Sequence, residues 1–181
     1  MSKRQVFFSF RFTYDAWRAG MIRNMGKVSD DSTFSDNDWE EVKKKSDIEI
    51  KRWIDREMNM RSCVVVLVGE HSYNRKWIDY EIQRAWETGK GIVAIRIHGL
   101  KNKDCVQAKL GHDPLSDFVI NTTINHIEKR SNLLDDEKRL SDVCKTYDPP
   151  YQESEDIYHY IENNIADWIE EAIRIRSRYP K

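Results

Sequence analysis

A tryptophan and a glutamate one helical turn apart are the residues of this sequence best suited to chemistry. They are Trp77 and Glu81, in the segment Asn74 to Ile82. Because a helix turns by about 100° per residue, Ile78 and Ile82 mark its buried side, and Glu81 lies roughly 60° from that stripe. A carboxylate in this position is partly buried, which raises its pKa or strengthens its hydrogen bonds.

The same spacing has a structural interpretation. Glu81 and Arg84 stand three residues apart, the separation at which opposite charges pair on a helix surface. Trp77 would then only pack against its neighbours. Spacing alone favours this alternative over a catalytic glutamate.

Sequence signatures of several other chemistries are absent. The chain has no GxxxxGK[ST] phosphate loop, no GxGxxG fingerprint and no GxSxG elbow. A receiver domain would carry acidic residues after its first strand, where this chain has Ser9 to Phe12. The histidines and cysteines lack metal-ligand spacing, so we expect no metal and no cofactor. The three cysteines, Cys63, Cys105 and Cys144, are predicted to be buried, reduced thiols.

The composition indicates one globular, cytoplasmic domain. The chain has 181 residues, of which 39% are hydrophobic and 34% charged, with a net charge of -1. Balanced charge gives no basic field for nucleic acid or an anionic membrane. The longest apolar run, Cys63 to Val68, is too short to span a bilayer, and the start of the chain lacks a signal-peptide core. We therefore expect neither nucleic acid nor membrane as a partner.

Three apolar runs without alternation predict strands that are buried on both faces, as in a parallel sheet. These runs are Val6–Phe10, Cys63–Val68 and Ile92–Ile97. Helical patterns separate them, which predicts an α/β fold with helices on both faces of the sheet. Ligands bind beyond the carboxyl ends of such strands, so Ser9–Tyr14, the Gly26–Asn37 loop and Gly69–Trp77 should meet there.

Helical periodicity predicts the remaining elements. The helices are Tyr14–Met25, a helix capped by Ser46 that ends near Asn59, one from Asn74 to Thr88 that stops at Gly89, and a final helix capped by Ser154. In the first helix one face carries Ala16, Trp17, Gly20, Met21 and Asn24. Between residues 100 and 142 the pattern is weak. We predict a short helix over Leu115–Ile120 and a last strand over Val143–Tyr147.

Several separated motifs, in order, resemble the TIR-like family of Thoeris anti-phage defence. They are Arg4–Phe10, Ile22–Asn24, Trp39–Glu40, Lys44–Asp47, Ile50–Ile54, Val64–Gly69 and Asn74–Ile82. The resemblance covers about residues 3–102 and, weakly, 140–148. It implies a flavodoxin-like, TIR-like three-layer sandwich around a parallel sheet of about five strands. We expect one domain over residues 1–181, with its core at 3–102, a variable edge at 103–140, and the last strand and helix at 141–178.

The resemblance also implies an activity. Members of this family cleave the nicotinamide–ribose bond of NAD+ and make an ADP-ribose-derived, often cyclic, signal. The family's catalytic glutamate ends a W-x-x-x-E pattern, which here runs from Trp77 to Glu81. By this resemblance NAD+ is a substrate, a phage-derived trigger starts the reaction, and self-association accompanies activation. The effector is a separate protein that is reached through the diffusible product.

A carboxylate suits this chemistry. Cleavage builds positive charge on the ribose, which a carboxylate against its hydroxyls stabilises. We expect further substrate contacts from Ser9, Phe10, Arg11, Asn24, Trp39, Lys45 and Trp77. Phe10 or Trp39 would stack on nicotinamide or adenine, with packing as the alternative for each, and Arg11 and Lys45 would meet the diphosphate.

Two other functions stay open. The first is a non-enzymatic TIR-like module that assembles with partners through its surface helices. The second is a transferase similar to nucleoside deoxyribosyltransferases, in which Glu81 would attack the sugar directly. Nicotinamide release separates an NAD+-cleaving enzyme from the interaction module, and a sugar trapped on Glu81 would identify the transferase.

Overall fold

The three apolar runs form neighbouring strands of one parallel sheet. They are β1 (Val6–Ser9), β2 (Cys63–Val68) and β3 (Gly91–Arg96), and a short strand β6 (Thr146–Tyr147) completes the order β1-β2-β3-β6. Every pairing in this sheet is parallel, which confirms the predicted α/β class. The computed structural model describes residues 3–28, 41–121, 123–132, 134 and 136–180.

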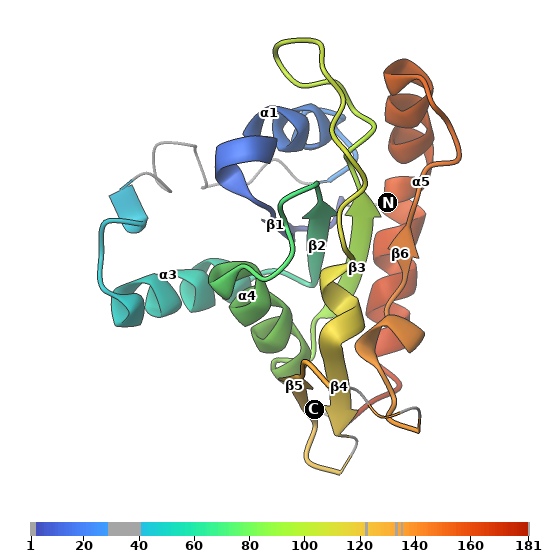
Figure 1. Cartoon of the computed structure of the whole chain (residues 1–181). Coiled ribbons are helices and arrows are strands. Elements are labelled where there is room, and N and C mark those ends of the chain that lie inside the picture. The colour runs from blue at the N-terminus through green and yellow to red at the C-terminus, as the bar shows by residue number, and fades with distance from the viewer. Residues whose placement is uncertain (1–2, 29–40, 122, 133, 135, 181) are drawn as a thin grey trace.

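Helices cover both faces of the sheet, which explains why its strands lack alternation. On β2, Val64, Val66 and Val68 face the core beneath α3 (Asp47–Asn59) and α4 (Lys76–Glu87). Residues Cys63, Val65 and Leu67 face the opposite core, beneath α1 (Phe12–Arg23) and α5 (Ser154–Arg176). Figure 1 shows α5 on one side of the sheet and α3 and α4 on the other. The three-layer arrangement is therefore confirmed.

The sheet has four strands within the described residues, against the five or so that the resemblance implied. Part of the chain between β3 and β6 forms a separate antiparallel hairpin of β4 (Phe118–Asn121) and β5 (His126–Lys129). The helix predicted over Leu115–Ile120 is wrong. Asp113 and Pro114 support only one 3-10 turn, η1 (Pro114–Asp117), and the β-branched residues that follow adopt an extended strand. A second such turn, η2 (Leu140–Asp142), precedes β6.

The helix boundaries follow the predicted caps in part. Ser46 caps α3 in a reciprocal capping box with Glu49, and Gly89 (φ 74°) follows the end of α4, both as predicted. Helix α4 begins at Lys76 with Arg75 as its N-cap, so Asn74 does not cap it. Ser154 is the first residue of α5 rather than its cap, and its hydroxyl accepts a hydrogen bond from the backbone of Lys101. No helix in these parts of the chain is long and apolar enough to cross a membrane.

Helix α1 turns a charged face inward. Its buried positions are Asp15, Arg18, Ala19 and Ile22, so the face on which Trp17 and Gly20 lie is not its core side. The Arg18 guanidinium is satisfied internally, because Nε donates to the Leu100 carbonyl at 2.6 Å and Nη1 contacts Asp15 Oδ1 at 3.1 Å. An ion pair therefore occupies positions that apolar residues usually take.

The cysteine prediction is wrong at one position. Cys63 and Cys144 are buried free thiols, but Cys105 is exposed. Cys105 lies in the loop after β3 with a φ of 59°, in a surface turn where nothing requires an apolar side chain.

Replacing Trp168 tests whether α5 is docked on the sheet. This side chain is 6% exposed and stacks on Tyr147 of β6, with ring centroids 4.1 Å apart. Trp168→Ala should lower the free energy of unfolding by about 3–5 kcal/mol, because it leaves a large cavity. Chemical denaturation measures this change, and a loss below about 1 kcal/mol would mean that the helix is not docked.

Two glycine-to-alanine changes should have opposite effects. A Cβ on Gly20 of α1 would meet nothing within 4 Å, whereas one on Gly91 would lie 2.7 Å from the backbone nitrogen of Ile173 in α5. Gly20→Ala should stabilise the protein by roughly 0.5–1 kcal/mol through helix propensity. Gly91→Ala should destabilise it, because a backbone contact cannot move aside cheaply. Thermal melts of both variants against the wild type make the comparison, and a matching sign would contradict this packing.

Candidate functional site

A hydrogen bond joins the end of the first strand to the helix that carries the W-x-x-x-E pattern. Ser9, the last residue of β1, approaches Glu81 of α4 with 2.5 Å between Oγ and Oε2. Both residues are buried, with 1% and 6% of their surface exposed. Glu81 therefore does not sit at the margin of the core, as its angle on the helix predicted, but inside it.

Burial changes the proton affinity of this carboxyl group. Loss of hydration raises the pKa of Glu81 to about 8, and the hydrogen bond with Ser9 opposes that rise. No cation contributes to the shift, so burial dominates. Near neutral pH this glutamate holds its proton, and a nearby positive charge would favour its ionisation.

A cleft opens at the carboxyl edge of the sheet, and neither Ser9 nor Glu81 is among the residues that line it. It has a volume of about 310 Å³. Its walls are residues Phe10, Arg11, Phe12, Thr13, Asn74, Arg75, Lys76, Trp77 and Ile78. Two of the three predicted segments, Ser9–Tyr14 and Gly69–Trp77, thus meet here, while the Gly26–Asn37 loop lies mostly outside the described residues. Phe10 directly follows Ser9, and Trp77 lies one helical turn before Glu81. Both Phe10 and Trp77 line the cleft.

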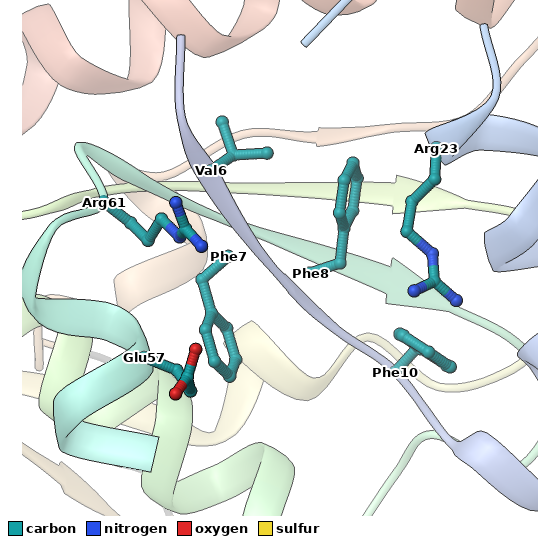
Figure 2. A pocket seen from close by; sticks show the side chains of 7 residues that line it. All are labelled: Val6, Phe7, Phe8, Phe10, Arg23, Glu57 and Arg61. Carbon is teal, nitrogen blue, oxygen red and sulfur yellow. The ribbon is translucent and has the colours of Figure 1, made fainter. Parts of the chain in front are cut away.

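Phe10, which follows the end of β1, also lines a small pocket along that strand. Figure 2 shows its ring near the side chain of Arg23 of α1. The Arg23 guanidinium carbon lies 5.6 Å from the Phe10 ring centre, a cation–π distance. This pocket measures about 30 Å³, which suits water rather than a nucleotide.

The structure separates the other predicted substrate contacts. Arg11 lines the cleft, and its Nε is buried without a hydrogen-bond partner among the described residues. Lys45 is exposed in the turn before α3, and Asn24, the C-cap of α1, lines a different hollow. The structure therefore pairs Ser9 with Glu81 and places Phe10, Arg11 and Trp77 in the cleft. Neither Lys45 nor Asn24 lines that cleft. Trp39 lies outside the described residues.

The surface-pair alternative for Glu81 is wrong. Arg84 instead contacts Asp55 of α3, with 2.9 Å between Nε and Oδ1. Asp55 also accepts a hydrogen bond from the Tyr80 hydroxyl at 2.9 Å. These contacts dock α4 on α3 and leave Ser9 as the partner of Glu81.

Two features of the cleft escaped the sequence analysis. Thr13 and Asn74 line it, and Asn74 adopts a left-handed conformation (φ 53°) that its residue type tolerates. Lys129 of β5 holds this end of α4, because its Nζ donates to Asn74 Oδ1 at 3.1 Å and to Asp79 Oδ2 at 2.7 Å. No local sequence pattern predicts the contacts of Lys129 with Asn74 and Asp79, because these residues lie far apart in the chain. Among the described residues, no group of histidine, cysteine or acidic side chains is arranged to hold a metal.

A parallel sheet with helices on both faces and a cleft at its carboxyl edge fits a TIR-like domain. Comparison with known proteins gives the family. The chain belongs to the family described as Thoeris protein ThsB, TIR-like domain, whose model matches residues 7–102.

A curated relative extends this match. It is the protein of Bacillus cereus (strain MSX-D12) named "Putative cyclic ADP-D-ribose synthase ThsB1", which is 38% identical over 108 residues. The alignment covers 57% of this chain and 56% of the relative. The chain thus spans little more than half the length of the relative that it matches.

Burial of Glu81 should make the stability of the protein depend on pH. A glutamate in an unfolded chain has a pKa of about 4.3, whereas that of Glu81 in the fold is about 8. Between these values the folded state holds a proton that the unfolded state has lost, so stability falls as the pH rises. Glu81→Gln stays neutral and should escape this loss, which is on the order of a few kcal/mol by pH 8.

Urea denaturation at pH 5, 6.5 and 8 measures this effect. The stability of Glu81→Gln relative to the wild type should increase at each step. Glu155→Gln, at an exposed position of α5, serves as the control and should follow the wild type. Parallel pH profiles for the wild type and Glu81→Gln would contradict a buried, protonated Glu81.

Proposed function

We propose that this chain cleaves the nicotinamide–ribose bond of NAD+, with Glu81 as the catalytic carboxylate. The single observation that carries the proposal is the buried Ser9–Glu81 pair, whose chain neighbours Phe10 and Trp77 line the cleft. A carboxyl group shielded from water exerts a strong field on a charge that develops beside it. The name of the Bacillus cereus relative supports the same chemistry.

In the proposed reaction the bond between ribose C1′ and the nicotinamide nitrogen breaks. Its electron pair passes to the nicotinamide ring, which leaves as a neutral molecule, and the ribose becomes an oxocarbenium-like cation. Water then attacks C1′ and loses a proton, or a nucleophile within the same molecule closes a ring. The Glu81 carboxylate stabilises the cation, as carboxylates do in glycoside hydrolysis.

This mechanism needs an ionised Glu81, and the positive charge of the substrate favours that form. The nicotinamide ring of NAD+ is positive, and a cation near a carboxyl group lowers its pKa. Binding above Trp77 and Phe10 therefore favours the charged form of Glu81, which is protonated near neutral pH without substrate. Ser9 remains as a hydrogen-bond donor to the carboxylate and orients it.

The wider role follows the family. We propose that the product is a cyclic or other ADP-ribose-derived second messenger, and that it activates a separate effector protein in anti-phage defence. In this proposal a phage-derived trigger starts the reaction in the cytoplasm, and self-association accompanies activation. The support is the match to the Thoeris ThsB family over residues 7–102.

Replacing Glu81 by glutamine tests the proposal, because the change removes the charge and keeps the size. In phage-infected cells that express the wild type, nicotinamide should be released and NAD+ should fall. With Glu81→Gln the rate should fall by about 10²–10³, as for loss of a principal electrostatic stabiliser. Mass spectrometry of cell extracts measures NAD+, nicotinamide and the ribosyl product.

Two carboxylates on the same helix provide controls. Asp79 is held by Lys129 and Glu87 by His126, both of β5, whereas the partner of Glu81 is Ser9 of β1. Asp79→Asn and Glu87→Gln should retain turnover, with melting temperatures reporting any structural cost. If Glu81→Gln consumes NAD+ like the wild type, the enzymatic proposal loses its basis and the interaction module is favoured.

A further inference from the structure

The outward face of α1 carries an aromatic stripe that the core does not use. The inward positions are taken by Asp15 and Arg18, while Trp17 is 57% exposed and Tyr14 51% exposed. Tyr14 contacts the ring of His71, with ring centroids 4.3 Å apart. Trp17 is the more exposed of the two and offers an aromatic surface to a ligand.

A groove runs along this stripe between α1 and the loop that follows β3. Its volume is about 790 Å³. Trp17 and Lys103 stand among its walls, and Gly20 lies in it with nothing within 4 Å of where a Cβ would be. Figure 1 shows the loop after β3 rising beside α1. The groove thus has an aromatic side on α1 and, on the loop, a side of mixed charge with Lys103 beside Asp104.

The loop wall is held in place. Buried Arg18 donates from Nη2 to the Val106 carbonyl at 3.0 Å and from Nε to the Leu100 carbonyl at 2.6 Å. The Asn102 side chain accepts hydrogen bonds from the backbone of Asp104 at 3.0 Å and of Val106 at 2.9 Å. The buried face of α1 therefore organises the groove on its other side, and a ligand does not have to order the wall.

The groove and the cleft share two lining residues, Phe12 and Thr13. Trp17 lies one helical turn, about 6 Å, beyond Thr13. The groove therefore continues along α1 from the cleft that Trp77 lines. An elongated ligand with an aromatic group at its far end matches this path.

We propose that the groove binds the adenosine half of NAD+, with Trp17 stacked on the adenine. Aromatic side chains are good stacking surfaces for bases. Lys103 and Lys43 bring positive charge to the phosphates, and Asp104, the one acidic side chain lining the described groove, accepts from ribose hydroxyls. Asn24, predicted as a substrate contact, then has a role here rather than in the cleft. This inference rests on the proposed function and extends it to the far end of the substrate.

Titration with AMP tests the groove apart from catalysis, because AMP lacks the bond that is cleaved. The wild type should bind AMP in calorimetry. Trp17→Ala should weaken binding about tenfold or more, and Trp17→Phe should restore most of it. Gly20→Leu should block the groove, since an added side chain there meets open space. Tyr151→Ala removes a similarly exposed ring, 49% exposed, in a different hollow, and should change nothing.

Turnover of two substrates gives the second measurement. In extracts of infected cells, Trp17→Ala should raise KM for NAD+ and leave kcat largely intact. Cleavage of nicotinamide mononucleotide, which has no adenosine, should be unaffected. Melting temperatures check that each variant is folded.

The outcomes separate the two proposals. If the wild type binds AMP through Trp17 but no nicotinamide is released, the cleavage proposal fails and the adenosine site stands. The adenosine site is overturned if the wild type does not bind AMP at millimolar concentration. It is also overturned if Trp17→Ala and Gly20→Leu bind AMP like the wild type, or if they alter only self-association in sedimentation. In the last case the groove is an interface between copies of the chain.

Discussion

The contact between Ser9 and Glu81 is the constraint around which the site is organised. A carboxyl group in the core is costly to bury unless it is protonated or well bonded, and here a single hydroxyl from the end of β1 contacts it at 2.5 Å. The contact fixes α4 against the carboxyl end of the sheet. It also fixes the cleft, because Phe10 follows Ser9 directly and Trp77 lies one turn before Glu81. Burial raises the pKa of Glu81, and the same contact that positions its carboxyl group opposes that rise.

Several side-chain contacts that hold α4 in place come from residues after 102, beyond the family match. Lys129 of β5 contacts Asp79, and His126 of the same strand contacts Glu87. At the far end, buried Arg176 of α5 donates to the Trp86 carbonyl at 2.7 Å and lies over the Trp86 ring. The hairpin and the last helix thus clamp the helix that carries Glu81. This gives Lys129 and His126, which lie outside the family match over residues 7–102, a structural task.

Helix α1 shows a second use of buried charge. The Asp15–Arg18 pair ties the helix to the loop after β3, and Asp15 approaches Gly69 so closely that a Cβ there would lie 2.2 Å from Oδ2. Gly69 therefore has to be glycine for a reason of space. With polar groups turned inward, the helix presents its aromatic residues outward, next to the cleft. A buried ion pair contributes little net stability, but it orients the surface on which the proposed substrate path depends.

The sequence by itself determined the parallel strands of the sheet. Runs such as Cys63–Val68 have no polar residue that could face water, so they specify strands covered on both sides. Spacing on the helix favoured a surface pair with Arg84, and the family resemblance singled out Glu81. Only the tertiary structure decided which face of α1 is buried, because the carbonyls that satisfy Arg18 belong to residues more than eighty positions away. The same holds for the partner of Glu81: local spacing offered Arg84, three residues on, while folding brought Ser9 from 72 residues away. Local patterns carry periodicity, whereas the satisfaction of buried polar groups depends on long-range contacts.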